Sequence, residues 1–143
     1  MKIYISAPLF NKVELEHNRS MRDSLMKLGF KTYLPQEDGS IAFNAIKQGA
    51  NIAETRRNIF NNNVKEIKNN DIVLCILDGR VPDEGVCVEL GIAYALGKIC
   101  IGYLTDQRSL DLYGPNLMIG ESLKVIAHSM RELKEVLLKY SRK

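Results

Sequence analysis

Four carboxylates close together are the most chemically informative feature of the sequence: Asp78, Asp83, Glu84 and Glu89. They directly follow the apolar run 71–77, which is typical of a central parallel strand covered on both faces. Glu89 is expected about one turn into the next helix, where the partial positive charge of the helix N-terminus favours an ionised carboxylate. A carboxylate held in this way can act as a nucleophile or stabilise a cationic transition state.

Asp83 and Glu89 are near enough in sequence to face one cavity. Two carboxylates around one bond are the minimum for glycosidic chemistry, and a close pair implies retention through a covalent intermediate. The same side chains could instead only accept hydrogen bonds from the first N–H groups of the helix. Gly85, between them, can let the backbone turn tightly or approach a ligand. Spacing alone does not separate these interpretations, and no P-loop, GxGxxG or GxSxG motif is present in the sequence.

Alternating strand and helix patterns must position these residues. Short apolar runs predict strands over 2–7, 31–34, 71–77, 99–104 and 124–127. Helical patterns are predicted around 15–28, 50–70, 86–96 and 129–140, the last with Ser129 as N-cap, and 36–40 is expected to be a polar connection. This alternation predicts a single α/β domain over 1–143, with helices on both faces of a parallel sheet. Ligands bind beyond the carboxyl ends of such strands, where the segments 6–11, 78–89 and the one after Leu104 should converge.

Composition excludes several classes of protein. Hydrophobic residues make up 45% and charged residues 26% of the 143 residues, as in soluble globular domains rather than disordered or fibrous ones. The net charge is only +3, without a basic stripe interleaved with aromatics, so a nucleic-acid partner is not expected. Cys75, Cys87 and Cys100 lack metal-binding spacing and are predicted to be buried, reduced thiols. No apolar run approaches the roughly 20 residues of a membrane span, and a cytoplasmic location is expected.

Three separated motifs resemble those of one enzyme family. The run DEGVCVELG, 83–91, resembles the signature D-x-G-T-x-x-E-x-G of nucleoside 2-deoxyribosyltransferases. The opening KIYISAP, 2–8, is similar to the first strand and substrate loop of that family, and 116–118 (NLM) is similar to a later element. The resemblance spans nearly the whole chain in the same order. It implies a flavodoxin-like three-layer α/β/α fold with a five-stranded parallel sheet.

The resemblance also implies a retaining, two-step transfer. Glu89 matches the nucleophile, which attacks C1′ of a 2′-deoxynucleoside, releases the base and holds the sugar until a second base takes it. Tyr4 matches a tyrosine that orients the nucleophile, although a strand tyrosine could simply pack in the core. Asp83 matches an aspartate that binds the deoxyribose hydroxyls. This chemistry needs only carboxylates and a bound sugar, so no metal and no redox cofactor is expected.

Further residues match positions that contact the substrate. Phe10 matches an aromatic that stacks on the base, and a flat apolar face holds purines and pyrimidines alike. Asn116 matches a residue that a neighbouring subunit lends to the sugar site, with Met118 beside it, so the resemblance implies a homo-oligomer. Phe10 could instead be a hydrophobic plug, and Asn116 could be only a helix cap.

The sequence departs from the family pattern at two positions. Val86 replaces the usual threonine of the signature, which removes a hydroxyl. Asn63 stands where many members carry an aspartate thought to handle the base, and an amide cannot protonate a base. Asp78 could supply that function instead, or the base could leave with less help. Asn63 could also be solvated helix surface.

Three functions are compatible with these observations. The first is a nucleoside 2-deoxyribosyltransferase of nucleoside salvage, acting on 2′-deoxynucleosides and free nucleobases. The second is an N-glycosidase that hydrolyses 2′-deoxynucleoside 5′-monophosphates with the same nucleophile. An anionic Asp83 would repel a phosphate and favours the first, and Arg56, Arg57 and Arg80 are expected to face solvent. The third is a nucleotide-sensing domain without catalysis, which would not require a carboxylate at Glu89.

Overall fold

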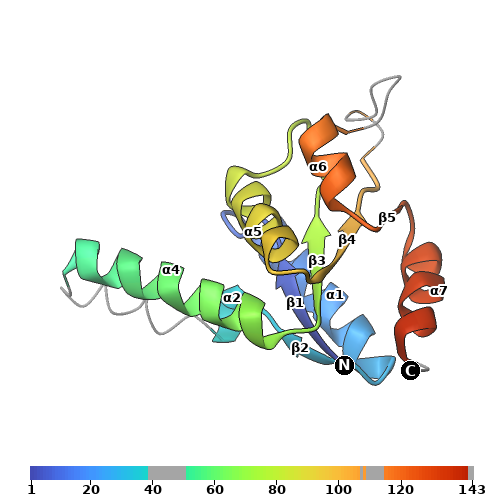
Figure 1. Ribbon diagram of the computed structural model, residues 1–143, viewed down its shortest axis with the longest axis horizontal. Helices are drawn as coiled ribbons and strands as arrows, with labels where there is room; N and C mark the ends of the chain where they lie inside the picture. The colour runs from blue at the N-terminus through green and yellow to red at the C-terminus, as the bar shows by residue number, and fades with distance from the viewer. Residues whose placement is uncertain (39–50, 107, 109–114, 142–143) are drawn as a thin grey trace.

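Five parallel strands form the centre of the protein (Figure 1). The computed structural model describes residues 1–38, 51–106, 108 and 115–141. The strands are β1 (Lys2–Ser6), β2 (Lys31–Tyr33), β3 (Ile72–Ile76), β4 (Ile99–Tyr103) and β5 (Val125–Ala127). They pair in the order β2-β1-β3-β4-β5, and all four pairings are parallel. This is the flavodoxin-like order, so the predicted fold class is confirmed.

Helices cover both faces of the sheet (Figure 1). Helices α1 (Lys12–Lys27) and α7 (Met130–Ser141) pack on one face, where their leucines and methionines join a core with β1 and β3. Helices α4 (Ile52–Asn69), α5 (Glu84–Ala95) and α6 (Leu117–Ser122) contribute to a second core on the opposite face. Strand β3, the sequence IVLCI, is buried along its whole length between the two cores. Burial on both faces explains why it reads as an unbroken apolar run.

Side-chain caps mark where the helices begin. Asn11 and Glu14 form a reciprocal capping box at the start of α1. Asn51 caps α4 by accepting from the N–H of the third residue beyond it. Ser129 caps α7, because its hydroxyl accepts from the N–H of Glu132 at 3.2 Å, as predicted. Each cap satisfies a backbone donor that the helix leaves unpaired.

Two boundaries differ from the sequence prediction. Helix α5 begins at Glu84 rather than at Val86, because Asp83 caps it and so adds two residues at its start. A short helix, α2 (Pro35–Asp38), occupies part of the segment expected to be a polar connection. Proline is favoured at the first helical position, since its missing N–H would have no partner there.

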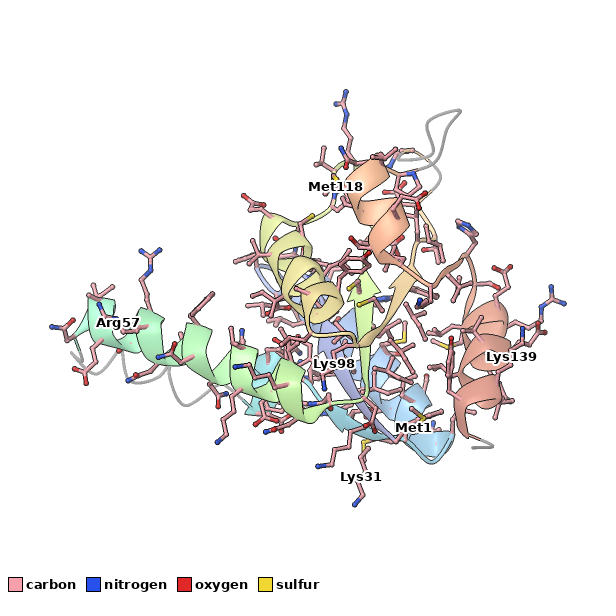
Figure 2. All side chains as sticks on the ribbon, viewed as in Figure 1. Met1, Lys31, Arg57, Lys98, Met118 and Lys139 are labelled. Carbon is pink, nitrogen blue, oxygen red and sulfur yellow. The ribbon has the colours of Figure 1, made fainter. Side chains whose placement is uncertain are left out.

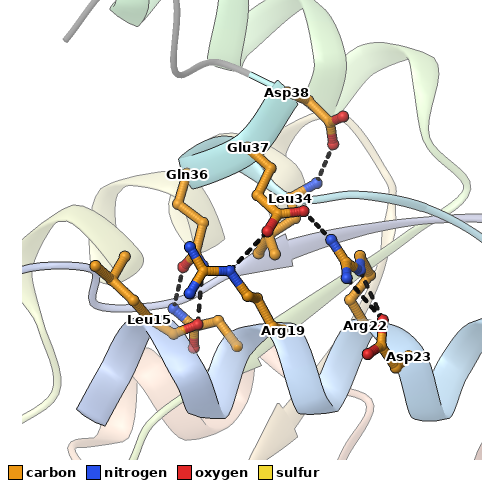
Figure 3. Close-up of polar contacts among 9 residues, drawn as sticks. Leu15, Arg19, Arg22, Asp23, Leu34, Gln36, Glu37 and Asp38 are labelled. Carbon is orange, nitrogen blue, oxygen red and sulfur yellow. Dashed lines mark hydrogen bonds and ion pairs between the residues drawn. The ribbon is translucent and has the colours of Figure 1, made fainter. Parts of the chain in front are cut away.

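Ion pairs join α1 to α2 (Figure 3). Arg19 Nε lies 2.8 Å from a carboxylate oxygen of Glu37, and Arg22 contacts both Glu37 and Asp23. The Nε2 atom of Gln36 donates to the carbonyl of Leu15 at 2.9 Å. Partly exposed pairs contribute little individually, but together these contacts hold α2 against α1.

A buried amide connects this helix pair to the segment after β1. Asn18 is almost fully buried, and its Nδ2 donates to the carbonyl of Pro8 at 2.8 Å and to Oε1 of Gln36 at 2.9 Å. Both hydrogens of the amide are therefore used. The segment that carries Phe10 is tied to α1 by this contact.

A glycine in β4 allows α6 to approach the sheet. A Cβ added at Gly102 would lie 2.9 Å from Cδ1 of Leu123 and 3.1 Å from Cδ1 of Leu77. Leu123 follows directly after α6, so the side chains of Leu123 and Leu77 would have to shift to accommodate a larger residue.

The three cysteines are not buried to the same extent. Cys75, Cys87 and Cys100 are free, but Cys87 is only half-buried, so the prediction that all three are buried was wrong for Cys87. Within the described ranges, no cluster of three or more metal-ligating side chains occurs, and no helix is long and apolar enough to cross a membrane.

Candidate active site

Glu89 is held by hydrogen-bond donors from three elements. The hydroxyl of Tyr4 donates to Oε1 at 2.7 Å, and the hydroxyl of Ser6 donates to Oε2 at 2.5 Å. The Nδ2 atom of Asn63 also donates to Oε1, at 3.2 Å. Strand β1, helix α4 and helix α5 therefore meet at one carboxylate, at the carboxyl edge of the sheet.

The alternation of β1 brings two of these donors together. Tyr4 and Ser6 are two residues apart in a strand, so their side chains point to the same face. Both are fully buried, and the ring of Tyr4 stacks on that of Tyr33 with centroids 5.5 Å apart and planes 16° apart. The donors are consequently fixed by the sheet before any ligand binds.

Burial dominates the electrostatics of Glu89. Removal from solvent raises its pKa, hydrogen bonds from Ser6, Tyr4 and Asn63 lower it, and the charge of Asp83 raises it again. The net effect is a raised pKa. The expected stabilisation of the ionised form by the helix N-terminus does not prevail, because α5 begins at Glu84 and places Glu89 beyond the first turn.

Tyr4 stays protonated for the same physical reason. Burial, followed by the adjacent charge of Glu89, raises the pKa of Tyr4 far above its ordinary value. A protonated phenol next to a carboxylate can only donate to it. Tyr4 is thus a permanent hydrogen-bond donor to Glu89.

Asp83 has a structural task at the start of α5. Its Oδ1 accepts from the N–H of Val86 at 3.0 Å. A Cβ at Gly85 would lie 3.0 Å from the same oxygen, so the cap favours glycine there. The cap is the structural alternative considered from the sequence, and the charge of Asp83 still acts on Glu89.

A cavity of about 480 Å³ lies between α4 and α5. Its described lining residues are Arg56, Ile59, Phe60, Asn63, Val64, Ile67, Glu84, Gly85, Val88, Glu89 and Ile92. The lining is mainly apolar, with a few polar groups, as is usual for sites that bind small organic molecules. Three predicted site residues, Asn63, Gly85 and Glu89, share this cavity.

Three other predicted residues are exposed. Phe10, on the segment after β1, is 78% exposed. Met118 is 73% exposed and lies on α6 (Figure 2). Asn116 caps α6 by accepting from the N–H of Met118 at 2.9 Å. None of the three is among the described residues that line the cavity.

Asp78 connects two strands. Its carboxylate accepts from the N–H and the hydroxyl of Thr105 and, at 2.8 Å, from the N–H of Asp106. These bonds join the segment after β3 to the segment after β4. Asp78 is also outside the described lining of the cavity, so the geometry gives it a structural task and no contact with the site.

Ser6 is the site residue that the sequence analysis did not identify as a partner of Glu89. It was included in the motif 2–8 and in the segment 6–11 that should converge on the site, without a role of its own. The available signal was its spacing from Tyr4, since any residue two positions from a strand tyrosine shares its face.

The family model for nucleoside 2-deoxyribosyltransferase matches residues 3–132. The chain belongs to this family. Its members are N-glycosyl transferases and hydrolases. No match was found among curated protein sequences.

Solved structures of two 2-deoxyribosyltransferases and of a CMP N-glycosidase are similar to this chain. A 2-deoxyribosyltransferase from Bacillus psychrosaccharolyticus is 28% identical, with a TM-score of 0.76 over 94% of this chain and 90% of that one. A 2-deoxyribosyltransferase from Leishmania mexicana is 21% identical, with a TM-score of 0.66 over 96% and 97%. A CMP N-glycosidase from Clostridium botulinum is 15% identical, with a TM-score of 0.58 over 98% and 99%. The last two likenesses concern the fold alone.

Proposed function

We propose that the protein is a nucleoside 2-deoxyribosyltransferase that exchanges the base of 2′-deoxynucleosides through a glycosyl ester on Glu89. The observation that carries the proposal is the carboxylate of Glu89, fixed by Tyr4, Ser6 and Asn63 beside a largely apolar cavity. A buried, oriented carboxylate next to a ligand-sized space is suited to nucleophilic attack.

The proposed reaction has two displacements at C1′. In the first, an oxygen of Glu89 bonds to C1′ while the bond from C1′ to the base nitrogen breaks, and its electron pair leaves with the base. In the second, a nitrogen of the incoming base bonds to C1′ and loses its proton, while the ester bond breaks and its electron pair restores the carboxylate. The proton that the incoming base loses balances the proton that the released base takes up. Two inversions give overall retention.

The surroundings of Glu89 favour the ester. Burial raises the pKa of Glu89 because the charged carboxylate is poorly solvated there. Formation of the ester removes that charge, so the buried surroundings stabilise the intermediate relative to the free carboxylate. The hydrogen bonds from Tyr4, Ser6 and Asn63 meanwhile support the ionised form that must attack.

The proposal assigns other predicted residues to contacts with the sugar, with the base and with a second subunit. Asp83 would bind the deoxyribose hydroxyls, and Phe10 would stack on the base. Asn116 would reach the sugar site of a second copy, with Met118 beside it. The exposure of Leu117 (72%) and Met118 (73%) supports this, since neighbouring exposed apolar side chains are typical of interaction surfaces.

A second candidate is the N-glycosidase acting on 2′-deoxynucleoside 5′-monophosphates. One observation favours it: Arg56, expected to face solvent, lines the same cavity as Glu89 and offers a guanidinium to an anionic group. The negative charge of Asp83, near enough to affect Glu89, opposes a phosphate dianion. The nucleoside therefore remains the preferred substrate.

Incubation of the purified protein with thymidine and adenine tests the proposal. We expect 2′-deoxyadenosine and thymine to form, and chromatography measures both products. A Glu89→Gln variant is the inactive control. Thymine without a new nucleoside would indicate hydrolysis. If only deoxynucleoside monophosphates react, and an Arg56→Gln variant raises KM for them, the second candidate is correct.

A further inference from the structure

The two oxygens of the Glu89 carboxylate are held unequally. Among the described residues, Oε1 accepts from Tyr4 at 2.7 Å and from Asn63 at 3.2 Å, whereas Oε2 accepts only from Ser6. An ionised carboxylate has about four lone-pair sites, two on each oxygen. Both sites of Oε1 are thus in use, and Oε2 keeps one that is open to an electrophile.

We propose that Ser6 is a positioning residue that presents Oε2 of Glu89 as the attacking atom. The inference rests on the proposed function and assigns different tasks to the two oxygens. Oε1 is the anchored oxygen, which Tyr4 and Asn63 retain through the reaction, and Oε2 is the oxygen that bonds to C1′.

The location of Ser6 suits this role. It is the last residue of β1, is fully buried, and pairs in register with Cys75 of β3. Its hydroxyl and that of Tyr4 come from one strand and hold opposite oxygens of the same carboxylate. The carboxylate plane therefore cannot rotate without breaking one of these bonds.

The chemistry of the first displacement requires the Ser6 contact to change. A lone pair of Oε2 forms the bond to C1′ while the C1′–N bond breaks and its electron pair leaves on the base. Oε2 then becomes the bridging oxygen of an ester, which is a weaker hydrogen-bond acceptor than a carboxylate oxygen. The Ser6 hydroxyl must turn to another acceptor until the second displacement restores the carboxylate.

This arrangement predicts different consequences for two deletions of a hydroxyl. Ser6 stabilises the ionised form of Glu89 and orients Oε2, but it also withdraws electron density from that oxygen. Its removal should make the carboxylate harder to ionise, and should weaken the attack of the ionised form less than removal of the Tyr4 hydroxyl does, because the less precisely held Oε2 becomes a better nucleophile. Removal of the Tyr4 hydroxyl should weaken the reaction at every pH, because it releases the anchored oxygen.

The test compares pH profiles of kcat/KM for Ser6→Ala and Tyr4→Phe. In the profile of Ser6→Ala, we expect the fall of kcat/KM on the acid side to occur at a pH about one unit higher than in the unmodified protein. The reason is that a hydrogen bond to the charged form of Glu89 is lost. The plateau of Ser6→Ala at higher pH should fall, but by less than that of Tyr4→Phe. Ser6→Cys, with a weaker donor, should give an intermediate shift. A Ser6→Ala plateau as low as that of Tyr4→Phe would overturn the assignment.

A second measurement separates this inference from the proposed function. Carboxyl-carbon NMR of labelled glutamate, with the Glu89 signal assigned by Glu89→Gln, reports the pKa of Glu89 without turnover. Ser6→Ala should raise that pKa, while Ser24→Ala, which removes a hydroxyl bonded to its own helix, should not. Ordinary turnover with no change in this pKa would refute the role of Ser6. A raised pKa in a protein that processes no deoxynucleoside would refute the proposed function and the attacking role of Oε2 together.

Discussion

Tyr4 and Glu89 are 85 residues apart in sequence, and the phenol of Tyr4 donates to Oε1 of Glu89 at 2.7 Å. The contact joins the buried strand β1 to helix α5. Tyr4 also stacks on Tyr33, so the donor belongs to the core as much as to the site. Its orientation is set when the sheet folds, and substrate binding does not have to create it.

Replacement of Tyr4 by Phe should lower kcat by about 10- to 100-fold. The change removes a hydrogen bond to a charged group, worth roughly 1.5–3 kcal/mol. Tyr33→Phe is the matched control, because it removes a hydroxyl from the stacked ring that bonds only to Asn62 among the described partners. Steady-state kinetics distinguish the two, and an equal loss of kcat in both variants would mean that the direct hydrogen bond from Tyr4 to Glu89 has no special role.

Replacement of Glu89 by Gln should abolish base exchange without lowering stability at neutral pH. Burial raises the folded-state pKa of Glu89, so between its ordinary value and that raised value the folded protein binds more protons than the unfolded chain. The contribution of Glu89 to the free energy of unfolding is therefore fully present at low pH, and it is lost as the pH rises through the pKa of Glu89 in the folded protein. Gln avoids that loss, so the variant should have a higher free energy of unfolding than the unmodified protein at neutral pH.

Urea unfolding at pH 7 and pH 5 checks this prediction. The difference in free energy of unfolding between Glu89→Gln and the unmodified protein should become smaller as the pH falls. Glu135→Gln, an exposed position on α7, should show no such narrowing. A Glu89→Gln variant that is less stable at pH 7 than at pH 5, relative to the unmodified protein, would contradict it.

Replacement of Asn63 by Asp should add a proton donor for the leaving base. A second carboxyl beside Glu89 cannot ionise freely, because like charges raise one pKa of the pair. We expect the activity optimum to move to lower pH and the preference for easily released bases to weaken. Asn61→Asp, exposed on α4, is the control, and rates over a series of bases of different acidity provide the measurement. Identical profiles for both variants would refute a role for position 63 at the base.

Two replacements of Asp83 separate its structural and substrate tasks. Asp83→Asn keeps an N-cap side chain and should leave the free energy of unfolding nearly unchanged, whereas Asp83→Ala should cost about 1 kcal/mol. If the carboxylate also binds the deoxyribose, both variants should raise KM. An Asn variant with ordinary KM would restrict Asp83 to capping α5.

A mixture of two inactive variants tests whether sites are shared. In a symmetric dimer of Glu89→Gln and Asn116→Ala chains, the mixed pair contains one site with both native residues. Random exchange of subunits should therefore restore about a quarter of full activity. Each variant alone should remain inactive, and a mixture that also stays inactive would argue that Asn116 serves its own chain.

The sequence predicted the fold well because apolar periodicity reports it directly. The run around Val73 reads as a covered strand, and the alternation of elements leaves few parallel topologies. Glu89 was identified as the nucleophile because of the motif around it, and the geometry places Tyr4 and Asn63 on its carboxylate. That role stays a prediction, because the geometry alone does not test catalysis.

Contacts between segments that are distant in the chain could not be predicted from the sequence. Ser6 looked like an ordinary strand residue, since only the folded sheet brings its hydroxyl to α5. The cap formed by Asp83 moved the start of α5 and changed the electrostatic expectation for Glu89. Asp78 is a similar case, because its bonds to Thr105 depend on the pairing of β3 with β4.

Asn18 determines how the segment that carries Phe10 can respond to a ligand. Both hydrogens of its buried amide are used, and giving up either contact would leave a buried polar atom unpaired. A displacement of this segment would therefore also strain α1, which carries Asn18, and α2, which carries Gln36. If this segment is transferred to a related protein in order to alter base preference, Asn18 must be transferred with it. Without Asn18, the segment would lose the hydrogen bond that attaches Pro8 to α1.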